Sequence, residues 1–374
     1  MKNKNKTHGF FLILVLVLTL MTSLISAPIA TPVECAIGDS PVCPAAATAA
    51  IQASTRTSKG ELKLYPGGLP FGVRFQTEGL IVVGFSDVVS EKGKCNPAYD
   101  AGIREKDVIT AINGEPVTST SRLSQALESN RGETITLTCK RSTGEFIAHV
   151  RPAFSPDDGR YKTGMLLRDS GAGIGTLTFI DPETLAFGGL GHGICDGDTG
   201  ELIPMSKGSV LGVTINGIVK GEAGTPGEIK GCFDCEKKGT LSGNTTCGVY
   251  GSLVSLPKDL PEGPLTVASA NELREGDAYI YCTLDSGGLP FRYSIRISDI
   301  DRSAKGNKCF TVKVTDKALI EKTGGIVRGM SGSPIIQNGK LVGAVTHVLV
   351  NDPTSGYGIF IENMLGQMGN PARQ

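Results

Sequence analysis

Tryptophan is absent from this chain of 374 residues, and histidine occurs only four times. Neither charge is in excess, because 37 basic residues are matched by 37 acidic ones. Nothing therefore favours nucleic acid as a partner, and no acidic run indicates a disordered tail. Sustained helical periodicity is also missing from residue 160 to the C-terminal tail, whereas 50 glycines separate short β-branched runs. This composition predicts a mainly β protein.

A complete metal-binding pattern is missing too. Cys232 and Cys235 have the C-x-x-C spacing of zinc and redox sites, but no second C-x-x-C follows and no H-x-x-x-H occurs. The ten cysteines are even in number, which permits disulfides in an exported chain. We expect a local disulfide or free thiols at this pair, and no metal or cofactor. A redox or zinc protein built on the pair is the alternative.

The N-terminus has the composition of an export signal. Three lysines precede residues 10–27, which are almost all apolar and long enough for a borderline membrane span. The cleavage pattern at its end is poor, because Pro28 interferes with both candidate cuts. We expect residues 1–27 to be a membrane anchor with cytoplasmic lysines, which places the body of the protein outside the cytoplasm. Residues 28–60, rich in Ala, Pro, Thr and Ser, are expected to be a linker.

Residues 61–152 have the pattern of a small separate domain, with apolar strands, an Asn-Gly turn and one amphipathic helical stretch. Residues 101–117, AGIREKDVITAINGEPV, resemble the signature of bacterial PDZ domains. That resemblance implies a glycine-rich loop whose amides bind the carboxylate of a peptide, which then adds to the sheet as a strand. A small β-domain without a ligand is the alternative. The loop maps to Gly67, Gly68, Phe71 and Gly72.

Residues 160–374 alternate short apolar strands with glycine turns, which suggests a sandwich or a pair of barrels. Within them, residues 328–335 read RGMSGSPI. Ser331 lies unhindered between two glycines, as a nucleophilic serine does whose own amide helps to form an oxyanion hole. The plain alternative is a tight turn, because Gly, Ser and Pro are the usual turn residues.

A base for Ser331 must come from the four histidines. His8 lies at the predicted anchor, and His149 follows a predicted turn and is expected to face solvent. His192, in GLGHGICD, lies between glycines that leave an imidazole room to meet another element, although a polar turn histidine would look similar. His347 lies in an apolar strand, where its plain interpretation is a half-buried strand residue.

The order of these parts separates two hydrolase folds. The α/β-hydrolases need G-x-S-x-G and the order Ser, acid, His. Here Ser333 replaces the second glycine, and no crossover helices are expected. Histidine before serine on β-rich sequence is the chymotrypsin order, and GMSGSP resembles the G-x-S-G-G-P of that class. The resemblance implies a double β-barrel in which Ser331 is the nucleophile, Ser333 a turn residue, and the amides of Gly329 and Ser331 the oxyanion hole.

The acid that orients the base is less clear from the residues. Asp316 ends an alternating strand fifteen residues before the serine. Asp196 and Asp198 lie close to the histidine, but in a glycine turn. Asp234 and Asn244 are nearer to the place where chymotrypsin-like enzymes carry the acid, so Asp316 departs from that wider pattern.

The PDZ-like segment, GLGHGICD and residues 324–362 together resemble the SpoIVB peptidases of endospore formers, over nearly the whole chain. The resemblance implies a serine endopeptidase whose catalytic group is His192, Asp316 and Ser331. It also implies cleavage of the chain itself and of a regulator of an intramembrane metalloprotease, between the two forespore membranes. That cut leads to activation of a late sigma factor. A catalytically inactive PDZ scaffold is the alternative.

Two further expectations concern substrate. A strand after the serine lines the specificity pocket in chymotrypsin-like folds, and here it contains Thr346 and His347. Alternation puts these two on opposite faces, and we favour Thr346 for the pocket. Residues 28–60 lack the apolar periodicity needed to pack, so this tethered segment is a candidate for self-cleavage.

Overall fold

The computed structural model describes residues 61–368, so the predicted anchor (1–27) and linker (28–60) lie outside the described residues. Strands dominate, which confirms the predicted mainly β class. No helix within residues 61–368 is long and apolar enough to cross a membrane.

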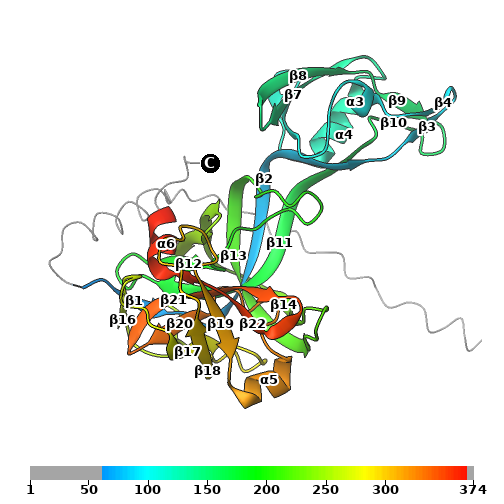
Figure 1. The fold of residues 1–374 in the computed structure, drawn as a ribbon. Coiled ribbons are helices and arrows are strands. Elements are labelled where there is room, and N and C mark those ends of the chain that lie inside the picture. Colours follow the sequence, from blue (N-terminus) through cyan, green and yellow to red (C-terminus); the bar gives the residue numbers. More distant parts are fainter. Residues whose placement is uncertain (1–60, 369–374) are drawn as a thin grey trace, which may run out of the picture. The chain divides into compact units, whose positions relative to one another are not determined.

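One sheet of twelve strands extends through much of the described chain (Figure 1). Strand β6 (Glu115–Pro116) pairs with β5 at its side. The other strands, in order across the sheet, are β16 (Leu265–Thr266), β1 (Lys63–Pro66), β11 (Met165–Ile180), β12 (Ala186–Gly189), β15 (Gly248–Leu253), β14 (Glu228–Thr245), β13 (Met205–Val219), β2 (Pro70–Phe85), β5 (Val108–Ile112), β7 (Ile135–Arg141) and β8 (Gly144–Val150).

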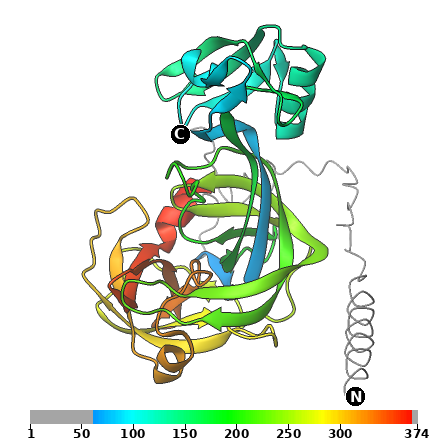
Figure 2. The ribbon, with the colours of Figure 1, turned by 90° about the vertical axis from the view of Figure 1, so that its right-hand side faces the viewer.

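Six later strands close into a barrel, drawn from yellow to red in Figure 2. Alternation is clear in β18, where the side chains of Tyr293, Ile295 and Ile297 are buried while their neighbours face outward. In order around the barrel the strands are β17 (Gly276–Cys282), β18 (Phe291–Ser298), β19 (Phe310–Val314), β22 (Asp352–Phe360), β21 (Lys340–Leu349) and β20 (Pro334–Gln337).

The remaining elements are short. Two small two-stranded sheets pair β3 (Val88–Ser90) with β4 (Gly93–Cys95) and β9 (Ala153–Ser155) with β10 (Arg160–Lys162). The helices are α3 (Pro97–Asp100), α4 (Thr120–Ser129), α5 (Lys317–Thr323) and α6 (Ile361–Gln367).

Helix α4 packs on the core of the PDZ-like part. Leu123 and Leu127, one turn apart, are buried among strand residues such as Ile109 and Leu137. The helix begins after Ser119, whose hydroxyl accepts a hydrogen bond from the amide of Arg122. The amphipathic stretch read from the sequence is therefore a helix with a true N-cap.

Strands β2 and β11 are unusually long and pair with each other from Met165 opposite Phe85 to Thr176 opposite Pro70 (Figure 1). One end of this pair contributes Leu80 and Val82 to the PDZ-like core, and the other contributes Phe71 and Val73 to a second core. Six strands of the large sheet also close on themselves, because β11, β12, β15, β14, β13 and β2 pair in that order and β2 pairs again with β11. The predicted pair of barrels agrees with these pairings, and β2 and β11 continue beyond this ring into the PDZ-like part.

Candidate active site

Glycines shape the loop between α5 and β20 that contains Ser331. Gly329 and Gly332 have φ angles of +100° and +94°, in the left-handed region that favours glycine. Gly332 is packed so closely that a Cβ on it would lie 2.0 Å from the carbonyl oxygen of Thr176 and 2.5 Å from the amide nitrogen of Leu190. The serine loop is therefore pressed against β11 and the residue that follows β12.

Hydrogen bonds hold the carbonyls of the serine loop and leave two amides unused. Thr176 donates from its amide to the Ser331 carbonyl (3.0 Å) and from its hydroxyl to the Gly329 carbonyl (2.7 Å). The amides of Gly329 and Ser331 donate to no described residue. Two available amides beside a serine hydroxyl are what an oxyanion hole requires.

The two serines of the motif have different surroundings. The hydroxyl of Ser331 donates to the carbonyl of Thr346 at 2.7 Å. Ser333 is buried, and its hydroxyl donates to the carbonyl of Met330 at 2.6 Å. Of the two hydroxyls, only that of Ser331 lies at a surface from which a substrate could approach.

His192 follows β12 on a backbone turned by Leu190 and Gly191, whose φ angles are +65° and +67°. Its Nδ1 lies 2.8 Å from the carbonyl oxygen of Gly193. A carbonyl oxygen only accepts, so Nδ1 carries the proton and Nε2 keeps its lone pair. Burial lowers the pKa of His192, and the bond to Gly193 partly offsets that shift. The ring is thus a neutral imidazole, the form that a general base needs.

Three segments meet at this place. The amide of Gly332 donates to the carbonyl of Val345 at 2.8 Å. A Cβ on Gly191 would lie 2.9 Å from the Cγ2 atom of Thr346. The structure therefore brings the loops that contain His192 and Ser331 together against strand β21.

Asn244, one of the alternatives for the third residue, holds the backbone that follows the histidine. Its side chain is buried, accepts from the amide of Ile194 (2.8 Å) and donates to the carbonyls of Ile194 (2.8 Å) and Ile203 (3.0 Å). It acts on the position of His192 through that backbone, because these bonds fix the residue two positions further along the chain.

Asp316, the predicted acid of the triad, forms no hydrogen bond or ion pair with His192 among the described residues, so the triad stays a prediction. Asp316 is the N-cap of α5, and its carboxylate accepts from the amides of Leu319 (3.1 Å) and Ser294 (3.3 Å). Among the described residues, no carboxylate forms an ion pair or hydrogen bond with His192. An aspartate just before a short helical stretch is a capping signal, and that signal was present in the sequence.

The two candidate pocket residues have different surroundings. Thr346 is only 1% exposed, and the pairing of β21 with β22 is irregular between Val345 and Val348. The Thr346 hydroxyl donates to the carbonyls of Asn307 (2.8 Å) and Tyr357 (3.1 Å), so it lines no open pocket. The ring of His347 packs against that of His192, so His347 is the candidate whose side chain reaches the predicted base.

The predicted PDZ loop, with Gly67, Gly68, Phe71 and Gly72, is also corrected. The amides of Gly67 and Gly68 donate to the carbonyls of Thr178 (3.0 Å) and Leu177 (2.8 Å) on β11. The Phe71 ring packs edge-on against Phe187 with centroids 5.8 Å apart. These residues belong to the core beside the peptidase strands, so they cannot offer amides to a peptide in the PDZ-like part.

A groove of about 790 Å³ lies instead beside helix α4. Its apolar lining includes Leu123 and Leu127 of the helix, and Met165 and Leu166 at the start of β11. An apolar channel between a helix and a strand fits an extended peptide. The sequence signal that could have located it is a second glycine followed by an apolar strand, Gly164 before MLL.

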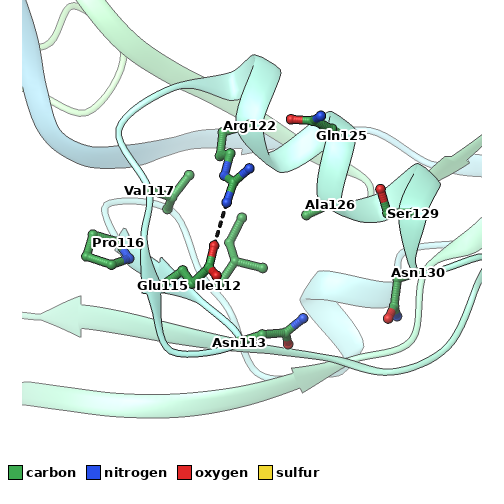
Figure 3. A pocket seen from close by; sticks show the side chains of 10 residues that line it. All are labelled: Ile112, Asn113, Glu115, Pro116, Val117, Arg122, Gln125, Ala126, Ser129 and Asn130. Atoms are coloured by element: carbon green, nitrogen blue, oxygen red, sulfur yellow. Dashed lines mark hydrogen bonds and ion pairs between the residues drawn. The ribbon is translucent and has the colours of Figure 1, made fainter.

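Charged residues of both signs, Arg160 and Lys162 with Asp87 and Glu128, also line this groove. A second hollow, of about 330 Å³, lies over α4 and the turn between β5 and β6 (Figure 3). It is crossed by the ion pair of Arg122 with Glu115. Six of its ten lining residues are polar or charged, which makes it less suited to an apolar peptide than the groove.

The cysteines form no bond with one another within residues 61–368. Eight of them are free thiols, and Cys232 and Cys235 are both exposed on β14. No group of three or more metal-ligating side chains gathers in the described part of the chain. The interpretation of Cys232 and Cys235 as free thiols therefore agrees with this structure.

Two family models match the chain. Residues 159–365 match the model described as SpoIVB peptidase S55, which covers more than half of the chain. Residues 94–141 match the model of a PDZ domain. No curated protein shows a significant match.

Solved structures with some similarity are remote. A PDZ domain of an SdrC-like protein from Listeria monocytogenes is 22% identical, over 24% of this chain and 87% of that one, with a TM-score of 0.20. The active form of the Rv3671c protease from M. tuberculosis is 15% identical, over 55% and 76%, with a TM-score of 0.28. An HtrA-type protease, AlgW with a tripeptide, is 15% identical, over 53% and 55%, with a TM-score of 0.31.

Proposed function

Because the chain belongs to the SpoIVB peptidase S55 family and is a serine endopeptidase, we propose that Ser331 is its nucleophile and His192 its general base. The observation that carries this assignment is the contact between the two loops at Gly332, which leaves no room for even a methyl group against Leu190. The amides of Gly329 and Ser331 are the donors of the oxyanion hole.

The reaction begins when the Ser331 hydroxyl leaves the Thr346 carbonyl and turns toward Nε2 of His192. The imidazole takes the proton while Oγ bonds to the scissile carbonyl carbon. The charge that develops on the carbonyl oxygen is met by the two amides, and the Gly193 carbonyl stabilises the imidazolium at Nδ1. The ring then gives its proton to the leaving amine, and a water activated by the same ring releases the acyl group.

The substrates we propose are extended protein segments. One is residues 28–60 of the chain itself, whose composition lacks the apolar residues needed for packing. By its family, another is a regulator of an intramembrane metalloprotease, whose cleavage leads to activation of a late sigma factor in sporulation. The groove beside α4 would hold a peptide or C-terminus of such a partner.

Location and organisation follow from the same proposal. Residues 1–27 would anchor the chain in a membrane, with residues 61–152 as a PDZ-like unit and 160–374 as the peptidase unit outside the cytoplasm. The apolar composition of residues 10–27 and the family support this. The site would then lie between the two forespore membranes.

Cleavage by the full chain tests the assignment. The substrates are β-casein, which is unstructured, and the chain itself, with N-terminal sequencing of any shortened form. Ser331→Ala should abolish both reactions, because loss of a nucleophile typically costs several orders of magnitude, whereas Ser333→Ala should retain activity. Full activity in Ser331→Ala would overturn the assignment. A new N-terminus outside residues 28–60 would overturn the self-cleavage proposal alone.

A further inference from the structure

Strand β11 connects the groove beside α4 to the catalytic loops. Its first residues, Met165–Leu167, line the groove and pair with β2 along one edge. Further along the same strand, Thr176 holds the carbonyls of Gly329 and Ser331, and the Thr178 hydroxyl donates to the carbonyl of Gly332 at 2.8 Å. A shift of β11 at the groove can therefore reach the serine loop along the backbone of the strand and then through the hydrogen bonds of Thr176 and Thr178.

Arg168 provides a second route, to the histidine loop. It directly follows the groove-lining residues, and its guanidinium forms ion pairs with Asp196 and with Asp198 (2.7 Å). The Asp196 side chain is only 1% exposed, so this pair is largely removed from water. By contrast, the ion pair of Lys106 with Glu201 (2.8 Å) is exposed on both sides, and such pairs contribute little.

Asp196 organises the hairpin that begins just after the catalytic histidine. Its carboxylate accepts from the amides of Asp198 (3.0 Å) and Thr199 (2.9 Å). Burial alone would raise the pKa of Asp196, but these amides and the Arg168 guanidinium hold that pKa below its ordinary value. The Asp196 carboxylate is thus ionised, and it holds both the Arg168 guanidinium and the backbone of the hairpin.

The hairpin in turn fixes the backbone at Ile194. The amide of Ile203 donates to the Ile194 carbonyl at 3.0 Å, and Asn244 bonds both backbone groups of Ile194. A shift of Asp196 is therefore carried to the residue two positions beyond His192. Arg168 reaches His192 through this chain of contacts and touches no reacting atom itself.

The backbone at Arg168 is irregular, so the direction of its side chain, and with it the ion pair with Asp196, can change. The pairing of β11 with β2 shifts register between Leu166 and Leu167 and again between Arg168 and Ser170. Such bulges re-aim a side chain and are common beside active sites. An extended peptide added beside Met165–Leu167 would fix the strand on the N-terminal side of Arg168.

We propose that Arg168 is a positioning residue that makes the peptidase respond to a peptide in the groove beside α4. The ligand is an extended peptide with apolar side chains, which suits the apolar lining of the groove. Its binding holds Arg168 on Asp196 and thereby sets His192 in place. This inference rests on the proposed function of Ser331 and His192.

The first test separates a positioning role from a purely structural one. In the full chain, Arg168→Met should lower kcat on β-casein at least about fivefold with little change in KM, the lower end of usual coupling between sites. Arg168→Lys should recover part of the loss. Arg151→Met, which changes an exposed arginine outside the groove and both loops, is the matched control. Unchanged kcat in a folded Arg168→Met protein would overturn the proposal.

The second test uses the reciprocity of coupling and needs no groove ligand. Ser331 is labelled with a fluorophosphonate, and hydrogen exchange of the amides in residues 160–168 is compared before and after labelling. Labelling should slow exchange there in the wild type and have no such effect in Arg168→Met. No change in the wild type, or an equal change in both proteins, would overturn the coupling. If Ser331 takes no label, the proposed function has failed and this inference fails with it.

If Arg168→Met does not fold, Asp198→Asn serves as the milder variant, because it removes only the exposed partner of Arg168. The expected loss of kcat is then smaller, and the exchange difference at residues 160–168 should be reduced rather than absent. A wild-type exchange difference in this variant would contradict a role for the Arg168 pairs.

Discussion

The imidazole ring of His347 lies against that of His192, with ring centroids 4.7 Å apart and ring planes tilted by 35°. The Nδ1 atom of His347 is buried and has no hydrogen-bond partner among the described residues. Burial, followed by the nearby charges of His192 and Lys308, lowers the pKa of His347 to about 4. The second ring is therefore neutral at pH 7 and leaves His192 free to serve as the base.

The acidic side of the pH–activity profile should reflect the buried position of His192. The base must be neutral, and burial lowers the pKa of His192 below its ordinary value of 6.5. Activity should therefore persist below pH 6.5 and fall only at more acidic pH. The measurement is kcat/KM on a fluorogenic peptide from pH 4 to 8, which reports the free enzyme. Loss of activity with a midpoint at or above pH 6.5 would show that burial does not lower the pKa of His192.

Stability should depend on pH through His347. Its folded pKa of about 4 lies below the ordinary 6.5, so between these values the unfolded chain binds more protons than the folded one. The free energy of unfolding should therefore fall as pH decreases from about 6.5 to about 4. Urea unfolding across this range measures it, with His347→Phe as the variant that keeps a ring and loses the titration. Equal pH dependence in both proteins would be inconsistent with this role.

Gly332 should tolerate no side chain. With φ at +94° and a Cβ 2.0 Å from the Thr176 carbonyl oxygen, Gly332→Ala should lose at least about 2 kcal/mol of stability and nearly all activity. Gly339→Ala is the control, because Gly339 has φ at +73° but no atom within 4 Å of its Cβ position. That change should cost about 1 kcal/mol from backbone strain alone and leave kcat unchanged. Similar activity of the two variants would contradict the described packing.

Asp316 should act as a helix cap rather than as the orienting acid. Asparagine caps a helix about as well as aspartate, so Asp316→Asn should keep both stability and kcat. Asp316→Ala should lose about 1 kcal/mol of stability. Thermal unfolding and casein cleavage measure the two effects. A large fall of kcat in a stable Asp316→Asn protein would restore this carboxylate to the catalytic group.

Much of the fold could be predicted because burial leaves a period in the sequence. Alternation at Tyr293, Ile295 and Ile297 predicts a barrel strand, and Leu123 and Leu127 predict the helix. The pair of barrels could be predicted, because short strands separated by glycine turns fill residues 160–374. The length of β2 and β11 could not, because nothing local marks where these strands leave the barrel and continue into the PDZ-like part.

The site was predictable in its serine and histidine and less so elsewhere. The order of His192 and Ser331 along the chain is typical of one hydrolase fold, and the sequence displays it directly. Alternation separates Thr346 from His347 but does not say which faces the site, because that depends on how β21 packs in the barrel. The PDZ loop was misplaced because the glycine-rich stretch at Gly67 is the stronger signal, whereas only the single Gly164 precedes the apolar strand that lines the groove.

Covalent labelling of the full chain with a fluorophosphonate, followed by mass spectrometry of the modified peptide, tests the central claim most directly. The reagent reports an activated serine, which requires the nucleophile and its base together. The account predicts a single label on Ser331, no label in Ser331→Ala, and a labelling rate reduced by at least about a hundredfold in His192→Ala. A label on another serine, or an equal rate in His192→Ala, would contradict it.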